Sequence, residues 1–149
     1  MQAIIFTGLQ ASGKSTFYRE RFLNTHIRLN LDMLRTRTRE SILLRACLEA
    51  KQPFVIDNTN PSMADRARYI EPALAAQFSV IGYYFLPEPT ACIARNAARP
   101  KEQRVPNVAI YGAVKRMQPP TMSEGFTEIY AVRVAPFNTF VVEPLVDNE

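Results

Sequence analysis

The sequence predicts an α/β fold in which helices cover both faces of a parallel sheet of about five strands. Short apolar segments rich in β-branched and aromatic residues alternate with longer amphipathic segments along most of the chain. Such alternation is typical of parallel strands joined by crossover helices. Polar residues also follow directly after three of the short segments. In a parallel sheet these positions lie at one edge, beyond the carboxyl ends of the strands, where ligands bind.

The first strand, loop and helix are predicted by residues 3–23. Residues 3–7 are a short apolar run, as in a buried strand, and residues 16–23 have the pattern of a half-buried helix. The apolar residues of that helix are Phe17, Tyr18, Phe22 and Leu23. Residues 8–16 between them read GLQASGKST, a complete G-x-x-x-x-G-K-[ST] phosphate-binding loop. The flanking strand and helix supply the structural context that this motif requires.

The residue type at each position of the motif has a role in binding phosphate. Gly8 and Gly13 let the backbone turn and approach a phosphate closely. The N–H groups of the loop and the start of the helix bind the anion, Lys14 places a charge on the β- and γ-phosphates, and Ser15 is the expected ligand of Mg²⁺. The cofactors predicted are therefore ATP and Mg²⁺. The predicted nucleotide-binding residues of the loop are Gly8, Leu9, Gln10, Ala11, Ser12, Gly13, Lys14, Ser15 and Thr16.

The next elements alternate in the same way. Residues 26–30 predict a second strand, and a helix over 33–50 is expected to bury an apolar stripe. Residues 53–57 predict a third, almost wholly apolar strand that ends in an acid, followed by a helix over 62–77. Ser62 is the expected N-cap of that helix, and Pro72 is expected to kink or interrupt it. The stripe of the 33–50 helix consists of Leu34, Ile42, Leu43, Ala46, Cys47 and Ala50.

The second half of the chain continues the pattern. A fourth strand is expected over 79–86 and a helix over 87–99, followed by a polar, charged segment over 99–106. A further helix over 107–117 precedes one or two strands, around 129–134 and 139–142. With no repeat or linker visible, residues 1–149 are predicted to form one domain.

Composition excludes several classes of protein. No apolar stretch approaches the ~20 residues of a membrane span, and the phosphate loop lies where a signal peptide would be, so no membrane partner and a cytoplasmic location are expected. Cys47 and Cys92 are expected to be reduced thiols inside helices. His26 is the only histidine, which excludes histidine metal sites and His-containing triads. The net charge is +4, and 14 of the 18 basic residues are arginine, which suits phosphate ligands but also an ordinary solvated surface.

A kinase must orient and deprotonate the hydroxyl that accepts the phosphate. Asp32, just after the second strand, is the best-placed base, although it would equally serve as the N-cap of the following helix. Arg35 and Arg39 are one turn apart in the predicted helix, so they could share a face that meets an anionic substrate. The alternative is a solvated basic stripe near Glu40 and Glu49.

Two further positions have both a functional and a structural interpretation. Asp57 ends a buried strand, where an acid helps to hold Mg²⁺, but it also begins a run of turn-forming residues. Residues 99–106 are interpreted as a mobile lid that brings an arginine over the phosphates, with Arg99 and Arg104 as candidates and Arg95 one turn before. A plain surface loop is the alternative.

These motifs together resemble the kinase domain of polynucleotide 5′-hydroxyl kinases, within the P-loop kinases related to nucleoside-monophosphate kinases. The matching segments are residues 8–16, the N-x-D-x-x-R element at 30–35, the D-x-T-N element at 57–60 with Arg66-Ala67-Arg68-Tyr69, the arginine-bearing lid at 95–106 and P-T-x-x-E-G-F at 120–126. The resemblance implies a P-loop NTPase fold of the nucleoside-monophosphate-kinase type with a lid. It also implies roles for individual residues: Asp32 as general base, Lys14 and Arg99 as catalytic cations, Arg95 at the nucleotide, Arg35, Asp57, Thr59 and Asn60 at the substrate, and Ser15 and Asp57 at the metal.

The function expected from the resemblance is ATP-dependent transfer of the γ-phosphate to the 5′-hydroxyl of a DNA or RNA end, as in nucleic acid repair. The best-studied relatives join this kinase to a 3′-phosphatase, and no D-x-D-x-T phosphatase motif is present here. A stand-alone kinase domain could have acquired another acceptor. The alternatives are therefore a kinase for a small metabolite, nucleoside or antibiotic, and an ATP-binding regulatory module that transfers no phosphate.

Overall fold

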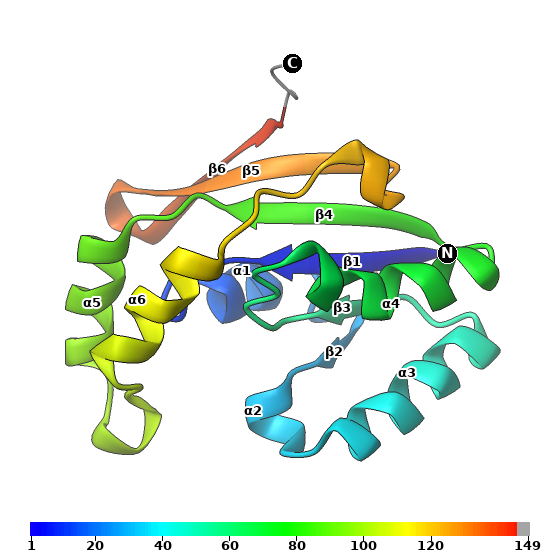
Figure 1. Cartoon of the computed structure of the whole chain (residues 1–149), viewed down its shortest axis with the longest axis horizontal. Helices are drawn as coiled ribbons and strands as arrows, with labels where there is room; N and C mark the ends of the chain where they lie inside the picture. The colour runs from blue at the N-terminus through cyan, green and yellow to red at the C-terminus, as the bar shows by residue number, and fades with distance from the viewer. Residues whose placement is uncertain (146–149) are drawn as a thin grey trace.

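A six-stranded sheet of order β2-β3-β1-β4-β5-β6 forms the centre of the computed structural model, which describes residues 1–145 (Figure 1). The strands are β1 (Gln2–Thr7), β2 (Ile27–Leu29), β3 (Phe54–Ile56), β4 (Ser79–Phe85), β5 (Glu128–Ala135) and β6 (Thr139–Pro144). The first five are parallel, which confirms the predicted sheet. Strand β6 instead pairs antiparallel with β5, because a tight turn with positive φ at Phe137 and Asn138 joins them.

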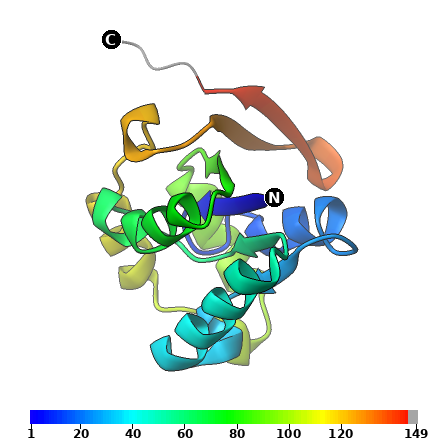
Figure 2. The same cartoon turned by 90° about the vertical axis from the view of Figure 1, so that its right-hand side faces the viewer.

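Helices cover both faces of this sheet, and two of them extend beyond its edge. They are α1 (Lys14–Arg21), α2 (Leu31–Leu34), α3 (Arg37–Ala50), α4 (Met63–Ala75), α5 (Pro89–Ala98) and α6 (Asn107–Arg116), with 3-10 turns η1 (Lys101–Gln103), η2 (Met122–Glu124) and η3 (Pro136–Asn138). Helices α1 and α4 lie on opposite sides of β1 in Figure 2. Helices α5 and α6 lie beyond the carboxyl ends of β1 and β4 in Figure 1. Within residues 1–145, no helix is both long enough and apolar enough to cross a bilayer.

The core has two layers because alternate side chains of β1 point to opposite faces of the sheet. Ala3 and Ile5 pack with α3 and α4 through residues such as Leu44 and Ile70. Ile4 and Phe6 pack on the other face against α1, β4 and β5, in a cluster dominated by aromatic rings. A third, smaller cluster joins the phosphate loop to α5 and α6 through Leu9, Ala11, Cys92, Ile110 and Ala113. This cluster fixes the position of the loop relative to the lid.

The helix predicted over residues 33–50 is in fact two helices. Helix α2 ends at Leu34, and its C-cap residue Arg35 has φ 75°, a value that no helix interior allows. Thr36 then caps α3 by accepting a hydrogen bond from the backbone N–H of Arg39 at 3.1 Å. Arg35 and Arg39 therefore do not share a helical face, and the guanidinium of Arg39 donates to the carbonyl of Leu34 at 3.1 Å.

The apolar stripe expected for that helix was wrong at Ile42, Leu43, Ala46 and Ala50, which are exposed, and was confirmed at Cys47 and in part at Leu34. Leu44 and Cys47 are buried together with the acidic Glu40. Leu23, expected on the buried side of the first helix, is likewise exposed. In contrast, α4 begins at Ser62 with the predicted cap and continues through Pro72, so the proline does not interrupt it. Cys47 and Cys92 are buried free thiols, as predicted.

A buried ion pair joins α4 to η2, the turn that precedes β5. Arg66 is 0% exposed and Glu124 4% exposed, and their side chains meet through two hydrogen bonds of 2.8 and 3.1 Å. The remaining guanidinium nitrogen of Arg66 donates to the carbonyl of Asn60 at 3.0 Å. Glu124 also accepts from the backbone N–H of Thr121 at 2.8 Å. The pair thus joins the turn after β3 to η2, and every charged oxygen and nitrogen of it has a partner.

Candidate active site

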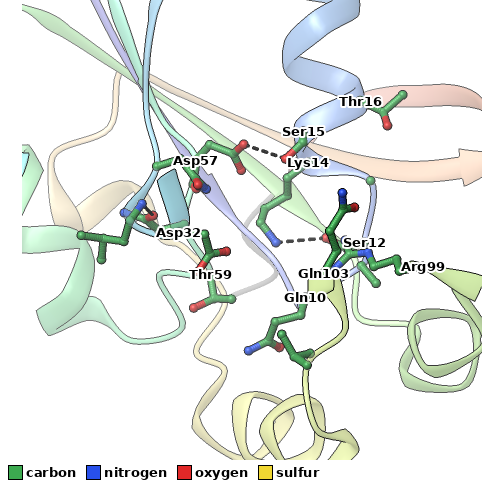
Figure 3. A pocket seen from close by; sticks show the side chains of 16 residues that line it. Gln10, Ser12, Lys14, Ser15, Thr16, Asp32, Asp57, Thr59, Arg99 and Gln103 are labelled. Atoms are coloured by element: carbon green, nitrogen blue, oxygen red, sulfur yellow. Dashed lines mark hydrogen bonds between the residues drawn. The ribbon is translucent and has the colours of Figure 1, made fainter. Parts of the chain in front are cut away.

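A cavity of about 320 Å³ opens at the carboxyl ends of β1, β2 and β3, where the sequence predicts that the polar strand ends meet. Figure 3 shows Asp32, Asp57 and Thr59 on one side of it and Ser12, Gln103 and Arg99 on the other, with Lys14 between them. The cavity is lined by Gln10, Ala11, Ser12, Gly13, Lys14, Ser15, Thr16, Asn30, Leu31, Asp32, Asp57, Asn58, Thr59, Arg99, Gln103 and Val105. Three strand ends, the phosphate loop and the lid segment therefore contribute to one site.

The two glycines of the loop are required by its geometry. Gly13 has φ 95°, and a Cβ there would lie 3.1 Å from the ring of Phe140. A Cβ on Gly8 would lie 2.8 Å from the Cβ of Phe85 and 3.0 Å from the hydroxyl of Ser12. The N–H of Gly8 donates to the carbonyl of Thr59 at 3.0 Å, which ties the loop to the turn after β3. The loop is thus fixed by contacts with β4 and with the turn after β3, and residues 10–16 line the cavity.

Lys14 lies within this loop and is half-buried. Its Nζ donates to the carbonyls of Leu9 at 2.6 Å and Gly8 at 3.1 Å, and lies 3.5 Å from the hydroxyl of Ser12. Burial lowers the pKa of Lys14 from 10.5 to about 8, although the negative charge of Asp57 opposes the shift. A phosphate bound in the loop would add negative charge and favour the protonated amine.

We expect nucleotide affinity to fall as the pH rises above 8. Free Lys14 loses its proton there, whereas the phosphates keep it charged in the complex, so binding at pH 9 must take up a proton. By linkage, Kd should increase by up to about tenfold per pH unit. Calorimetric titrations with ATP at pH 7 and pH 9, each in two buffers of different ionisation enthalpy, measure this uptake.

Lys14→Arg is the matched control for this titration, because arginine keeps its charge throughout the range. Its Kd should change little between pH 8 and pH 9.5. Burial raises the pKa of Cys92, the neighbouring thiol, which moves its titration away from that of Lys14. An equal slope in the wild type and in Lys14→Arg would show that another group titrates.

The hydroxyl of Ser15 and the carboxylate of Asp57 form a pair that fits a magnesium ion. Ser15 donates to Asp57 Oδ2 at 3.1 Å, and Asp57 is 1% exposed (Figure 3). Among residues 1–145, no three His, Cys, Asp or Glu side chains gather closely enough to hold a metal by themselves. Mg²⁺ usually binds through one or two protein oxygens together with water and substrate phosphates, which this pair beside the loop allows.

Two asparagines place Asp32 at the cavity. Asn30 caps α2 by accepting from the N–H of Met33 at 3.0 Å, and its amide donates to the carbonyl of Asp57 at 2.6 Å. Asn58 accepts from the N–H of Leu31 at 3.0 Å. Because Asn30 is the cap, Asp32 is not needed for that purpose, and its exposed carboxylate lies in the first turn of α2 on the cavity wall.

The side chain of Asn58 is held by a polar network formed by Glu40, Tyr69 and Arg37. Its amide donates to Glu40 at 3.1 Å and to the hydroxyl of Tyr69 at 3.2 Å. Tyr69 donates to Glu40 at 2.9 Å, and Arg37 donates to both. Burial, reinforced by the Glu40 charge, raises the pKa of Tyr69 to about 12, so the hydroxyl remains a donor. Glu40, which the sequence suggested as a solvated surface charge, instead anchors the wall that carries Asp32.

The lid segment brings Arg99 and Gln103 to the cavity opposite Asp32. Asn96 closes the base of this segment, because its amide donates to the carbonyl of Val105 at 2.6 Å and accepts from the N–H of Val105 at 3.0 Å. Arg104, the second candidate for a lid arginine, does not line the cavity, and its guanidinium donates to the carbonyl of Arg99 at 2.7 Å.

Five residues predicted to contact the nucleotide or the substrate lie outside the lining. Two of them, Gly8 and Leu9, are at the start of the loop, and Leu9 is buried in the core cluster of α5 and α6. Arg95 donates to the carbonyl of Ala11 at 3.0 Å and so braces the loop. The amide of Asn60 is buried and donates to the carbonyl of Phe6 at 2.8 Å. Arg35 is exposed at the end of α2.

The sequence predicted no site role for four lining residues, namely Leu31, Asn58, Gln103 and Val105. Asn58 had a signal only as part of a turn-forming run, and Gln103 and Val105 only as part of the 99–106 segment.

Comparisons with known proteins agree with this geometry. A family described as an AAA domain matches residues 4–120. A curated relative, the bifunctional polynucleotide phosphatase/kinase of Schizosaccharomyces pombe, is 27% identical over 148 residues, covering 88% of this chain and 33% of the relative. The chain thus spans about a third of that protein.

Solved structures share the fold at low sequence identity. A gluconokinase from Sinorhizobium meliloti has a TM-score of 0.61 at 17% identity, covering 90% of this chain and 83% of its own. Kti12 from Chaetomium thermophilum, in complex with ADP-AlF3, has a TM-score of 0.66 at 16% identity, covering 88% of each chain. The family match includes the phosphate loop, all three strand ends and the lid segment. The chain therefore belongs to this AAA-domain family and has the nucleotide-binding fold of a P-loop kinase-like domain.

Proposed function

We propose that this chain is a kinase that uses ATP and Mg²⁺ to phosphorylate the 5′-hydroxyl of a DNA or RNA end. The observation that supports it most directly is that Asp32, Lys14 and Arg99 line one cavity with the phosphate loop. Phosphoryl transfer needs cations around the transferred group and a carboxylate that orients the accepting hydroxyl. A nucleotide-binding module that transfers no phosphate has no need for this base.

In this proposal each residue has one task. The loop N–H groups and Lys14 bind the β- and γ-phosphates, and Arg99 approaches from the opposite wall to stabilise the charge that develops during transfer. Asp32 accepts the proton of the attacking hydroxyl. Ser15 and Asp57 would hold Mg²⁺, which supplies further charge neutralisation at the phosphates. Because α2 is held by Asn30 and Asn58, the carboxylate of Asp32 is at the site before the substrate binds.

The nucleic-acid acceptor is supported by the motif order and by the chemistry next to Asp32. The N-x-D-x-x-R element, the arginine-bearing segment at 95–106 and the 120–126 segment resemble those of polynucleotide kinases, and the curated relative has that activity in its name. Arg35, the exposed C-cap residue of α2, follows Asp32 by three residues, and the exposed Arg39 lies in the first turn of α3. An acceptor with a phosphate close to its hydroxyl would meet these cations.

The test is a transfer assay with γ-labelled ATP and a panel of acceptors. The panel contains single- and double-stranded DNA and RNA oligonucleotides with 5′-hydroxyl ends, nucleosides and small polyols such as gluconate. Label is expected on the oligonucleotides, and oligonucleotides that already carry a 5′-phosphate serve as the matched control. Labelling of the 5′-hydroxyl oligonucleotides should decrease steeply with added salt, because the phosphate contacts that hold them release counterions when they form.

The panel also separates the alternatives. Label on a polyol or nucleoside alone, with no salt dependence, would identify a small-molecule kinase. Binding of ATP without any labelled acceptor would favour a regulatory module.

A further inference from the structure

Arg28 occupies the position next to the proposed magnesium ligands. It lies on β2, the edge strand of the sheet, and its Nε donates to Asp57 Oδ2 at 2.8 Å. Its Nη2 donates to the hydroxyl oxygen of Ser15 at 2.8 Å. The guanidinium therefore bridges the same two side chains that line the cavity at the phosphate loop and that have the oxygen donors Mg²⁺ prefers. No motif in the sequence includes this residue.

The bridge uses the atoms that a metal would need. A serine hydroxyl has two acceptor lone pairs, and Nη2 of Arg28 takes one of them. Asp57 Oδ2 already accepts from both Ser15 and Arg28, so the carboxylate oxygen nearest the hydroxyl is fully engaged. A divalent cation bound to Ser15 would also lie close to a permanently charged guanidinium, and the two would repel each other.

We propose that Arg28 competes with Mg²⁺ for the Ser15–Asp57 pair, so that metal binding requires the guanidinium to withdraw. In its bridging position the arginine neutralises the buried carboxylate and orients the Ser15 hydroxyl. When a nucleotide brings Mg²⁺, the metal takes over both tasks. Arg28 then sets how strongly nucleotide binding depends on the metal, a property that rests on the nucleotide and magnesium binding of the proposed function but not on its acceptor.

The surroundings of Arg28 allow this movement. Its side chain is 26% exposed, whereas that of Asp57 is 1% exposed, so the arginine can leave while the carboxylate stays. The guanidinium carbon also lies 5.9 Å from the centre of the Tyr18 ring, and an aromatic face stabilises a cation that no longer has a carboxylate partner. The hydroxyl of Tyr18 is fixed by donation to the carbonyl of His26 at 2.6 Å.

Arg28→Gln tests the competition through metal binding rather than activity. Mn²⁺ replaces Mg²⁺ as a spectroscopic probe, and its affinity for the protein–ADP complex is measured by electron paramagnetic resonance. We expect the affinity to increase by about tenfold or more in Arg28→Gln, because the competing cation is gone. Arg45→Gln, which removes an exposed arginine of α3 outside the cavity, is the matched control and should leave the Mn²⁺ affinity unchanged.

A second measurement needs no variant and so does not depend on whether Arg28→Gln folds. The Nε–H resonance of Arg28 in the wild type should shift and exchange faster with water when Mg²⁺ and ADP are added together, but not when ADP is added alone. Unchanged Mn²⁺ affinity in a folded Arg28→Gln, or an Arg28 resonance that Mg²⁺ with ADP does not move, would overturn the proposal. Failure to bind ADP at all would instead reject the proposed function itself.

Discussion

Replacing Asp32 by asparagine is expected to lower kcat for phosphoryl transfer by about 10²–10⁴-fold, the usual contribution of a positioned acid or base. The affinity for ATP should change little, because Asp32 lies on the wall opposite Ser12 and Arg99 and is the least of the charges that act on Lys14. Asparagine preserves the size of the side chain but cannot accept the proton of the hydroxyl. Single-turnover transfer rates and calorimetric ATP affinities, measured on the same preparations, separate these two effects.

The control for this variant is Glu49→Gln, which removes an exposed acid from α3 outside the cavity. Its transfer rate should equal that of the wild type. If Asp32→Asn transferred phosphate at the wild-type rate, Asp32 would not be the base. If Asp32→Asn also lost ATP binding, the substitution would have changed the structure around α2 and not only removed the base.

Breaking the buried Arg66–Glu124 pair is expected to cost about 3–5 kcal/mol of unfolding free energy. In Glu124→Gln the guanidinium of Arg66, which is 0% exposed, remains buried without its counter-charge. Chemical denaturation of both proteins gives the difference in unfolding free energy.

Two further variants show whether the cost arises from an unpaired charge. The double variant Arg66→Met/Glu124→Leu removes both charges and should recover much of the lost stability, as is known for buried pairs replaced by apolar groups. Glu143→Gln removes one partner of the exposed Arg133–Glu143 pair, whose atoms are 3.8 Å apart, and should cost less than about 1 kcal/mol. Equal losses in Glu124→Gln and Glu143→Gln would contradict this account.

The sequence predicted the strand–loop–helix unit well because its signals are local. A glycine with positive φ, a lysine and a hydroxyl at fixed spacing leave few alternatives for the backbone of residues 8–16. Buried parallel strands such as β1, β3 and β4 are also local signals, since they appear as short apolar runs between polar turns. The meeting of Asp32, Asp57 and the loop then followed from the rule that parallel strands end at the same edge.

The break between α2 and α3 was not predictable in this way. Arg35 adopts a positive φ that its side chain does not favour. The short helix before it is held by a partner far away in the chain, because the N–H of Leu31 donates to Asn58. The burial of Glu40 depends equally on partners far away in the chain, namely Tyr69 and Asn58. No periodicity in residues 33–50 carries this information.

The sequence by itself determined the fold class, the phosphate loop and the polar strand ends, because each is specified by residues close together in the chain. Only the tertiary structure decided which arginines reach the site: Arg99 lines the cavity, Arg95 braces the loop, and Arg28 bridges Ser15 and Asp57. A sequence pattern does not distinguish one arginine from another, because all of them have the same length and charge. Their partners are selected by distances across the sheet edge, which exist only after β1, β2 and β3 have come together.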